Sequence, residues 1–466
     1  MYTTIQQAVR IALGGAVLVP FVAMASSGPA TPAAQSAMVP EQPGVAAYAM
    51  PASHFMPESS KQLAGDAGHR AHTNLVVHNP RGVNATRLED LAQPAPQANP
   101  GPDATFAEYP ASLACVYKMG TTYTGCAPTN NATYNAKGGN RAIAVVAAYD
   151  NPTAASDLKA AAAFFGLPAA KFTKVYANGN GSCSVPAYNS GWALESAMDT
   201  QWAHAMAPAA RIILVEACTN SYADLMYAEQ IAEQQVLAYG GGEVTNSWSS
   251  GEWSTESSDW DWVFRSNWTS GSPVKFIFSA GDAGLGPQYP SSSPWVVSAG
   301  GTTINRDATT QAFLSESCWA GSGGGTSAYE TYSNTFGTGT GPWTNFQYPI
   351  FGESARRTPD VSFDADPNSG AWVMLNAAWY VVGGTSLSAP ALAGIMNNSG
   401  NQLGIAPRNG GYYANTENDL LYAQLVSNKE YYTNFYDVTT GSNGASATAG
   451  WDYCTGVGSP RGKLGK

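Results

Sequence analysis

The sequence predicts an α/β fold, in which helices flank a parallel sheet within a single large domain. From residue 106 onward, apolar runs with the length of strands alternate with amphipathic runs with the length of helices. The strand-like runs 141–150, 211–218 and 274–282 are apolar at most positions, which is typical of strands covered on both faces. Alternation of such strands with helices indicates parallel strands joined by helical crossovers.

The first 25 residues have the features of a secretory signal. Arg10 precedes an apolar stretch, and Ala23-Met24-Ala25 forms a small-x-small cleavage site. A membrane anchor is the alternative, but two glycines and a proline interrupt a run that is short for a span. Residues 1–25 are therefore predicted to be a signal peptide, and the mature protein is expected to be secreted, either extracellular or periplasmic.

Residues 26–105 are rich in Ala, Pro and Gln, and we interpret them as a short pro-segment or linker. The remaining residues, 106–466, are predicted to form the single folded domain. The net charge of −11 argues against nucleic acid or an anionic membrane as a partner. Charged residues make up only 12% of the chain. This composition suits an acidic medium, because little charge accumulates as the pH falls.

Six cysteines in an exported chain predict three disulfides. Other pairings remain open, but proximity in the sequence favours one set: Cys115–Cys126, Cys183–Cys218 and Cys318–Cys454. No C-x-x-C spacing occurs, which removes the commonest zinc and redox motifs.

A serine nucleophile is predicted at the start of a helix. The run GGTSLSAPALAGIM, residues 383–396, places Ser386 at the turn between a strand and an apolar helix. There the hydroxyl is exposed and the backbone N–H points into the same space. A helix N-cap is the alternative for a bare G-T-S, but the longer G-T-S-x-S-x-P pattern favours a nucleophile. Pro390, early in this helix, is expected to cost no hydrogen bond.

The base for this serine is predicted to be a carboxylate. Only one histidine, His204, follows residue 80, and it lies in the same predicted helix as Glu195 and Asp199. On a helix these two acids are about 40° apart on one face, whereas His204 lies about 140° round from Asp199. His204 is therefore interpreted as a packed or surface histidine.

Glu195 and Asp199 could also belong to a solvated helix face. Their neighbours Trp192, Leu194 and Met198 are apolar, and the predicted helix contains no lysine or arginine, which favours a functional pair instead. Two adjacent carboxylates raise the pKa of one of them and can share a proton. The pair is therefore predicted to supply the base and a second carboxyl behind it.

These motifs resemble the sedolisin family of serine-carboxyl peptidases, which have a subtilisin-like fold and a Ser-Glu-Asp triad. The E-x-x-x-D helix, the SAGDAG stretch at 279–284 and the G-T-S-x-S-x-P run match the family in order. The glycine-rich run at 321–327, the run RRTPDVSFDADP and the C-terminal stretch match as well. The resemblance extends over about residues 106 to 462.

The resemblance implies a role for each site residue. Glu195 would remove the proton from Ser386 as it attacks the scissile carbonyl, and Asp199 would orient Glu195 and share its proton. Asp282, in the SAGDAG stretch, would stabilise the oxyanion together with the Ser386 N–H. Only a protonated carboxyl can donate a hydrogen bond, so an acid optimum is expected. Without these partners, Asp282 would be a turn aspartate.

The function implied is hydrolysis of peptide bonds in proteins and peptides by a secreted monomer that acts in acid. Endopeptidase activity is expected, and a tripeptidyl-peptidase is the alternative within the family. The stretch EVTNSWSSGEW, residues 243–253, is expected to pair with an extended substrate. Its aromatic residues would also suit a sugar-binding surface, so an inactive exported binding protein on the same scaffold is the alternative from another class.

Asp150 ends the strand-like run AIAVVAAYD, where subtilisins place their triad aspartate. That aspartate requires a histidine after it, and His204 faces away from the predicted site. We therefore interpret Asp150 as a turn residue or a minor contributor to substrate binding.

The C-terminal stretch, which includes YDVTTGSNG and AGWDYCTG, resembles the calcium site of the family. The resemblance implies one structural Ca²⁺, with water completing its shell. The ligands would be the carboxylates of Asp437 and Asp452 and the backbone carbonyls of Val438, Thr448 and Gly450. Thr448 stands where the family often has glycine, a change that a carbonyl ligand tolerates. On DVTTGSNG alone, a metal-free polar loop would be the better interpretation.

Overall fold

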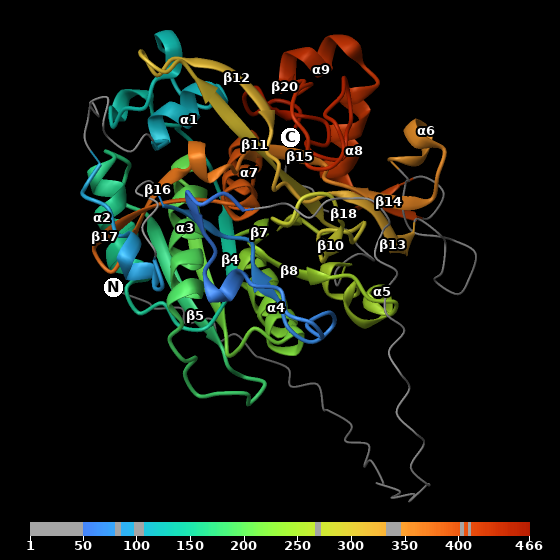
Figure 1. Cartoon of the computed structure of the whole chain (residues 1–466). Helices are drawn as coiled ribbons and strands as arrows, with labels where there is room; N and C mark the ends of the chain where they lie inside the picture. Colours follow the sequence, from blue (N-terminus) through green and yellow to red (C-terminus); the bar gives the residue numbers. More distant parts are fainter. Residues whose placement is uncertain are drawn as a thin grey trace, which may run out of the picture. The chain divides into compact units, whose positions relative to one another are not determined.

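An eight-stranded sheet runs through the computed structural model, which describes residues 50–79, 85–96, 107–265, 272–331, 346–400, 405–408 and 412–466 (Figure 1). Seven strands follow the order β12-β11-β9-β7-β4-β6-β5, and β15 pairs with β11. All pairs in this sheet are parallel except β11 with β12. The strands are β4 (Ala142–Ala148), β5 (Lys171–Ala177), β6 (Arg211–Ala217), β7 (Gly242–Asn246), β9 (Val274–Ser279), β11 (Val297–Arg306), β12 (Phe313–Cys318) and β15 (Val361–Asp364). The predicted α/β fold with a parallel sheet is confirmed.

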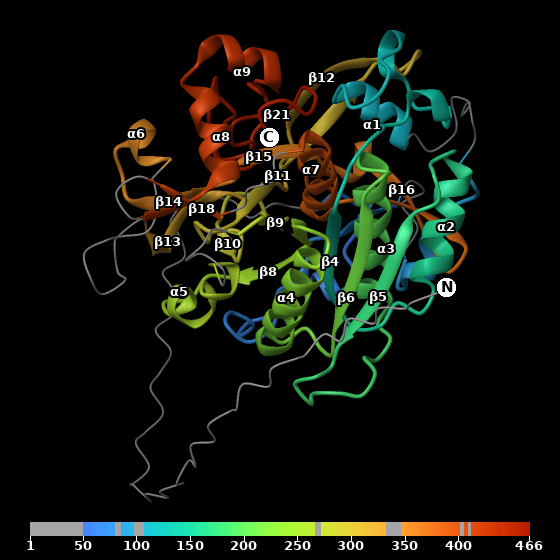
Figure 2. The same cartoon turned by 180° about the vertical axis from the view of Figure 1, so that it is seen from behind.

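The central strands are buried along their whole length, as their continuous apolar runs require. Every residue of β4 is buried. This strand pairs with β6 from Ala142↔Arg211 to Ala148↔Ala217, and with β7 from Ala142↔Gly242 onward. Figure 2 shows β4, β6 and β5 side by side.

Helices cover both faces of this sheet. The helices α3 (Ser190–Met206) and α7 (Thr385–Ser399) pack against each other and share an apolar cluster with Ile143 of β4. The helix α4 (Tyr222–Leu237) belongs to a second cluster, which contains Ala144 of the same strand. Because successive residues of a strand point to opposite faces, the two clusters lie on opposite sides of the sheet.

The start of α3 is determined by a side-chain cap. The Asn189 Oδ1 atom accepts hydrogen bonds from the backbone N–H groups of Gly191 and Trp192, both at 3.1 Å. These are N–H groups of the first helical turn, which have no partner within the helix. The cap fixes the register with which α3 presents Glu195 and Asp199.

The other elements surround this core. The remaining α-helices are α1 (Pro110–Val116), α2 (Ala154–Phe164), α5 (Glu256–Trp260), α6 (Tyr348–Phe351), α8 (Thr416–Leu425) and α9 (Asn428–Asn434). Short 3₁₀ helices span Glu58–Ser60, Leu88–Leu91, Thr124–Cys126, Ala132–Tyr134, Val263–Arg265 and Pro367–Ser369. Within the described ranges, no helix has both the length and the apolar character needed to cross a bilayer.

Five smaller sheets complete the fold. A four-stranded sheet has the order β1-β3-β17-β16, and a three-stranded sheet the order β10-β8-β2. Their strands are β1 (His54–Phe55), β3 (Val76–His78), β16 (Ala371–Leu375), β17 (Ala378–Gly383), β2 (His72–Thr73), β8 (Trp248–Gly251) and β10 (Gln288–Tyr289). The two-stranded sheets are β13 (Gly325–Thr331) with β14 (Ala355–Thr358), β18 (Ile405–Arg408) with β19 (Tyr412–Asn415), and β20 (Phe435–Tyr436) with β21 (Ser459–Pro460).

Residues 50–79, inside the predicted pro-segment, contribute strands to two of these sheets. The strand β2 is an edge of the sheet that contains β8, with His72 opposite Ser249. The strand β3 lies between β1 and β17, and Val76 pairs with Gly383. This part of the chain therefore runs past the end of β17, where α7 begins.

The three predicted disulfides are confirmed: Cys115–Cys126, Cys183–Cys218 and Cys318–Cys454. The last one joins β12 to the C-terminal loop across a sequence separation of 136 residues. In the chain-entropy description, a cross-link over so long a loop removes about 5 kcal/mol of unfolded-state entropy. This disulfide therefore stabilises the folded state and ties the loop that follows β20 to β12.

Candidate active site

Ser386 lies at the start of α7, directly after the turn that follows β17. Gly384 makes this turn with φ at +97°, and a Cβ atom there would lie 2.1 Å from the carbonyl oxygen of Asn74. The position therefore needs glycine both for its conformation and for the space it leaves. Ser386 is fully buried, and its N–H belongs to the first helical turn, where the acceptor must come from outside the helix.

Pro390 lies inside α7, beyond the first turn, so the expectation that it costs no hydrogen bond is wrong. Its missing N–H leaves the carbonyl of Ser386, four residues earlier, without a helical donor. The hydroxyl of Ser247 takes this place and donates to the Ser386 oxygen at 3.2 Å. The same hydroxyl lies 2.8 Å from Asp199 Oδ1. Ser247 thus connects the start of α7 to the carboxyl groups of α3.

The structure brings Glu195, Asp199 and Ser386 together. The Ser386 Oγ atom donates to Glu195 Oε2 at 3.0 Å. Both carboxyl groups are buried, and burial raises their pKa values well above the usual range. The neighbouring charge of Asp199 raises the pKa of Glu195 further. A pair of this kind is stabilised by one shared proton.

Asp282 follows β9 and is held by one of its two oxygens. Its Oδ1 atom accepts from the backbone N–H and the Oγ1 hydroxyl of Thr385, each at 2.8 Å. Within the described ranges no hydrogen bond reaches Oδ2, although this atom is buried. Burial raises the pKa of Asp282 to about 8. In acid its Oδ2 atom therefore carries a proton and can donate.

Residues of the chain itself occupy the space in front of Ser386. The N–H of Ser386 donates to the carbonyl oxygen of Asn74 at 3.0 Å, and the N–H of Asn74 donates to the carbonyl of Ser247 at 3.2 Å. A Cβ atom on Gly384 would lie 2.4 Å from Asp282 Oδ2 as well as close to the Asn74 oxygen. The carbonyl oxygen of Asn74 thus lies where the Ser386 N–H and the free oxygen of Asp282 converge.

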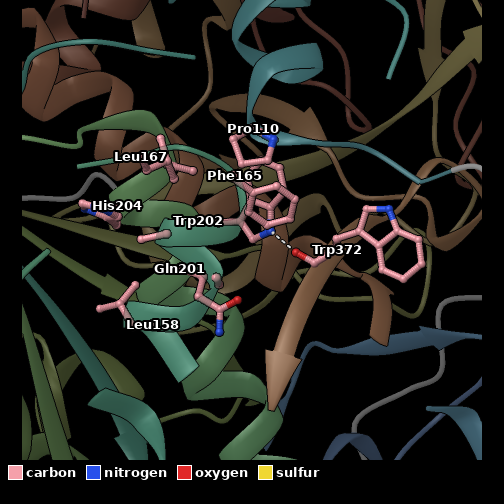
Figure 3. Close-up of a pocket in the computed structure, with 11 residues that line it drawn as sticks. Pro110, Leu158, Phe165, Leu167, Gln201, Trp202, His204 and Trp372 are labelled. Carbon is pink, nitrogen blue, oxygen red and sulfur yellow. Dashed lines mark hydrogen bonds between the residues drawn. The ribbon is translucent and has the colours of Figure 1, made fainter. Parts of the chain in front are cut away.

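His204 lies outside this group, as the helical geometry predicts. It is buried, and its Nε2 atom lies 2.9 Å from the carbonyl oxygen of Pro168. It lines a small apolar cavity of about 10 Å³ together with Phe165 and Trp202 (Figure 3). No histidine of the described ranges is hydrogen-bonded to Ser386. The interpretation of His204 as a packed histidine is confirmed.

Asp150 also lies apart from Ser386, at the end of β4. Its carboxylate forms an ion pair with Lys174 and accepts from the Tyr176 hydroxyl at 3.1 Å. Burial, the largest single cause, would raise the pKa of Asp150, but the hydrogen bonds to its neighbours and the charge of Lys174 together outweigh it and lower the pKa. Asp150 is therefore an ion-paired residue at a strand end, in agreement with its interpretation as a turn residue.

Four of the predicted calcium ligands are joined in two pairs in the C-terminal loop. Asp437 Oδ1 accepts from the N–H of Gly450 at 2.9 Å, and Asp452 Oδ2 accepts from the N–H of Thr448 at 3.1 Å. Burial, followed by the charge of Asp437 and to a smaller extent that of Asp452, raises the pKa of Tyr431. Within the described ranges no group of three or more His, Cys, Asp or Glu side chains is suited to a metal. A cation here would therefore depend on backbone carbonyls beside the two carboxylates, which is a donor set of the type that calcium accepts.

Sequence analysis missed two residues of the site. Ser247 lies in the stretch 243–253, which was predicted to bind substrate through its backbone, and no motif marks its hydroxyl as a partner of Asp199. Asn74 lies in the predicted pro-segment, in the run HTNLVVH. The adjacent valines of this run favour a strand, but strands of two and three residues are too short for periodicity to identify.

Three curated relatives are similar to parts of the chain. Xanthomonalisin from Xanthomonas sp. (strain T-22) is 29% identical over 273 residues, covering 52% of this chain and 28% of the relative. Kumamolisin from Bacillus sp. (strain MN-32) is 32% identical over 219 residues, covering 41% and 35%. Sedolisin from Pseudomonas sp. (strain 101) is 31% identical over 186 residues, covering 37% and 28%. The matched region thus spans between 28% and 35% of the length of these relatives.

A solved structure shares the fold. Pseudomonas sedolisin, a serine-carboxyl proteinase complexed with two molecules of pseudo-iodotyrostatin, matches with a TM-score of 0.59 at 22% identity. The match covers 77% of this chain and 96% of that chain. The predicted subtilisin-like architecture is thereby confirmed, although no family model matches the chain. The three curated relatives, sedolisin among them, agree with the resemblance to the sedolisin family that the sequence motifs indicate.

Proposed function

We propose that this protein is a serine-carboxyl peptidase that is secreted and hydrolyses peptide bonds of proteins in acid. One observation supports this most directly: the Ser386 hydroxyl donates to Glu195 at 3.0 Å while the Ser386 N–H binds a peptide carbonyl oxygen at 3.0 Å. A nucleophile with its base, and an N–H that binds the carbonyl to be attacked, are the parts that acyl transfer requires.

The proposed reaction has two halves. Ser386 Oγ attacks the scissile carbonyl and gives its proton to Glu195, which passes a proton to the leaving amine as the C–N bond breaks. Water then attacks the ester on Ser386, again with Glu195 as base, and releases the new carboxyl group and the serine hydroxyl. Asp199 shares the proton of Glu195 and so keeps one negative charge distributed over the pair. Ser247 orients Asp199 through its hydroxyl.

Asp282 would act as the second donor to the oxyanion. Its Oδ1 atom is fixed by Thr385, so the proton that it holds in acid lies on the unpartnered Oδ2. A pKa of about 8, raised by burial, keeps this proton in place in an acidic medium. A donor that is already oriented costs little reorganisation when the charge develops on the oxygen.

Endopeptidase activity is supported by the length of the occupied cleft. The chain remains hydrogen-bonded to the protein more than three residues upstream of the scissile bond. The N–H of Ala71 donates to the carbonyl of Asn220, and the N–H of Tyr222 donates to the carbonyl of His69. A tripeptidyl-peptidase must block the cleft three residues upstream of the scissile bond. Here the backbone continues through that part of the cleft. An inactive binding protein is less well supported, because Ser386 and Glu195 form the hydrogen bond that catalysis needs.

One calcium ion is proposed for the C-terminal loop. Asp437 and Asp452 would give carboxylate oxygens, and Val438, Thr448 and Gly450 would give backbone carbonyls. When bound, the ion would neutralise the two carboxylates and cross-link the loop, so its contribution would be to stability and not to the reaction.

The activity is tested by digesting a long unstructured protein at about pH 4 and identifying the products by mass spectrometry. Internal cuts throughout the substrate are expected, in the wild-type chain but not in Ser386→Ala. A ladder of tripeptides would identify a tripeptidyl-peptidase instead. Equal cleavage by Ser386→Ala would overturn the proposal altogether.

A further inference from the structure

The side chain of Asn74 is enclosed by polar groups. Its Nδ2 atom donates to Ser249 Oγ at 2.9 Å and to Ser279 Oγ at 2.7 Å. Its Oδ1 atom lies 3.1 Å from the hydroxyl of Ser249, which is placed to donate to it. Asn74 is 1% exposed, and both serines are fully buried. The N–H donors of the Asn74 amide are therefore satisfied without water, and its oxygen can accept the one proton of Ser249.

Gln288 closes this enclosure. The hydroxyl of Ser249 is also within hydrogen-bond distance of Gln288 Oε1, so its single proton can be donated to the amide oxygen of Asn74 or to that of Gln288. The side chain of Gln288 packs directly against the backbone of Gly281, which has φ at +111°. A Cβ atom on Gly281 would lie only 2.6 Å from Gln288 Oε1. We refer to Ser249, Ser279 and Gln288 as the carboxamide pocket. These three residues are neutral, so the pocket offers hydrogen bonds and no counter-charge.

The backbone on both sides of Asn74 is bound as an extended peptide. Upstream, His72 and Thr73 pair antiparallel with Ser249 and Trp248 of β8. Downstream, Val76 and Val77 pair antiparallel with Gly383 and Val382 of β17, just before the turn to Ser386. Since the Ser386 N–H binds the Asn74 carbonyl, the bond presented to the nucleophile is Asn74–Leu75. The carboxamide pocket is then the subsite for the residue before the scissile bond.

We propose that this subsite selects asparagine, so that the enzyme cleaves preferentially after Asn, with residues 72–78 as its built-in example. The inference rests on the proposed peptidase function. Leucine has nearly the same size as asparagine but would leave the two serine oxygens without the N–H groups that they accept from, which costs the desolvation of each oxygen. An ionised aspartate would bring a charge into a pocket without a cation. Glutamine is one methylene longer than the enclosed side chain.

The test compares peptides that differ at one residue, with the full chain after incubation in acid as the enzyme. The parent peptide has the sequence of residues 70–78, RAHTNLVVH, and the others carry Asn74→Leu, Asn74→Gln or Asn74→Asp. We expect kcat/KM for the parent to exceed that for the leucine peptide by about 100-fold or more, because a site built for hydrogen bonds rejects a partner that lacks them. Mass spectrometry should locate the cut between Asn and Leu.

A pocket variant separates selection from general activity. Ser279→Ala should lower kcat/KM for the asparagine peptide while leaving that for the leucine peptide unchanged or higher. Ser298→Ala, which removes another fully buried serine hydroxyl on the neighbouring strand β11, should change neither value. Circular dichroism checks that both variants are folded, and the peptide series on the wild-type chain gives an answer even if a variant is not.

The outcomes distinguish the two proposals. Cleavage of the leucine peptide as fast as the asparagine peptide would overturn the subsite assignment and leave the peptidase function intact. Cleavage of none of the peptides, nor of an unstructured protein, would overturn the peptidase function and the subsite with it. A cut at another bond of the parent peptide would show that residues 72–78 lie in the cleft in a different register from a substrate.

Discussion

At the scale of single residues, the two carboxyl oxygens of Asp282 have different surroundings. Thr385 occupies Oδ1 through two hydrogen bonds, and Oδ2 faces the position of the scissile carbonyl oxygen. The raised pKa of about 8 means that Asp282 loses its proton only as the medium becomes neutral to alkaline. Activity should therefore fall as the pH rises, because a carboxylate at this point would repel the oxyanion.

Asp282→Asn tests this assignment. The amide has nearly the same shape and donates a hydrogen bond at every pH. We expect a slower enzyme whose alkaline limb moves upward or flattens, since the group that sets the limb has been removed. The measurement is kcat/KM between about pH 2.5 and about pH 7 on one peptide, with folding checked at each pH. An active variant with an unmoved limb would show that another group sets it.

The choice of a carboxylate as base gives a second prediction. Glu195→Gln should lower kcat by about 10⁴-fold, the usual cost of removing the base from a serine peptidase. His204→Ala should keep most of the activity, because His204 is bonded to Pro168 on the other side of α3. The matched control is the melting temperature of both variants. Loss of most of kcat in a folded His204→Ala protein would contradict the carboxylate mechanism.

Residue-scale prediction from the sequence succeeded where the contact is local. Glu195 and Asp199 are one helical turn apart, so helical spacing alone places their side chains together. The partner of Asn74 lies 175 residues away in sequence, and nothing short of the tertiary fold reveals it. The prediction for Pro390 was wrong because the motif does not show how far into α7 this proline lies. The helical hydrogen bond that Pro390 removes is replaced by one from the hydroxyl of Ser247, which lies outside the motif.

At the scale of elements, β1 and β3 bring two histidines close together. The rings of His54 and His78 have centroids 6.5 Å apart, and His54 Nε2 lies 4.0 Å from Asp366 Oδ1. Burial lowers the pKa of His54, and burial followed by the neighbouring His54 lowers that of His78 to about 4. Asp366 partly offsets both shifts. A histidine whose pKa is lowered on binding weakens that binding as the pH falls from about 6.5 to about 4.

Residues 72–78 should therefore leave the cleft more readily in acid. The expected result is that the lag before full activity shortens as the pH falls through this window, and that Leu75 appears as a new N-terminus. His78→Gln cannot gain a charge and should show a weaker dependence of the lag on pH. The control is His69→Gln, because His69 lies in the same part of the chain but is exposed. An identical pH dependence in His78→Gln and the wild type would contradict this explanation.

The C-terminal loop gives a fourth prediction. A cation bound only by the folded state adds to its stability, so EGTA should lower the melting temperature by about 5–10 °C at mildly acidic pH. Asp437→Asn should melt at the lower temperature and no longer respond to EGTA. The control is Asp307→Asn, which replaces a half-buried aspartate in another loop. A melting temperature of the wild type that is the same with and without chelator would remove calcium from this loop.

Among the elements, the parallel strands were the easiest to predict, because burial on both faces produces unbroken apolar runs. The strand β11 begins within the apolar run PWVVSAGG and continues through Thr302 to Arg306. The extension is polar because it pairs antiparallel with β12 and not with a covered parallel strand. The strands β2 and β3 are too short to be recognised by periodicity, and pairing with β8 and β17 is what forms them.

At the scale of the whole molecule, buried carboxyl groups outnumber the cations that could neutralise them. Glu229, Glu256, Glu330 and Asp364 are all buried, and in each case burial is the largest cause of a pKa raised well above the usual range. A group whose pKa is higher in the folded state holds an extra proton there. Its contribution to stability is complete below its unfolded pKa and is lost as the pH rises through its folded pKa.

The free energy of unfolding should therefore fall as the pH rises above about 4.5, where the same carboxyl groups lose their protons in the unfolded chain. The expected slope is about 1.4 kcal/mol per pH unit for each group that retains an extra proton. Urea unfolding of Ser386→Ala, which cannot digest itself, measures this slope without interference. A midpoint that stays constant or rises over this interval would show that the carboxyl groups are neutralised in some other way.

The fold class and the disulfide pairing could be predicted for the molecule as a whole. Alternation of strands and helices determines the class, and Cys115–Cys126 and Cys183–Cys218 are close in sequence as well as in space. Cys318–Cys454 followed only by elimination once the other two pairs were chosen. The position of residues 50–79 could not be predicted, because their composition resembles that of a linker and the partners of β2 and β3, in β8 and β17, lie far away in the sequence.

The peptide in the cleft is part of the same chain as the enzyme, and this determines how the rate of its cleavage depends on the protein concentration. Before the Asn74–Leu75 bond is cut, Asn74 is presented to Ser386 at an effective molarity set by the chain and not by the amount of protein. Activation within one molecule would then be first order and insensitive to dilution. After the cut, the part of the chain that ends at Asn74 becomes an ordinary ligand, whose occupancy falls as the solution is diluted, while Leu75 and the residues after it remain attached to the enzyme. Hydrolysis of the single Asn74–Leu75 bond would change the segment from an intramolecular substrate to a dissociable ligand.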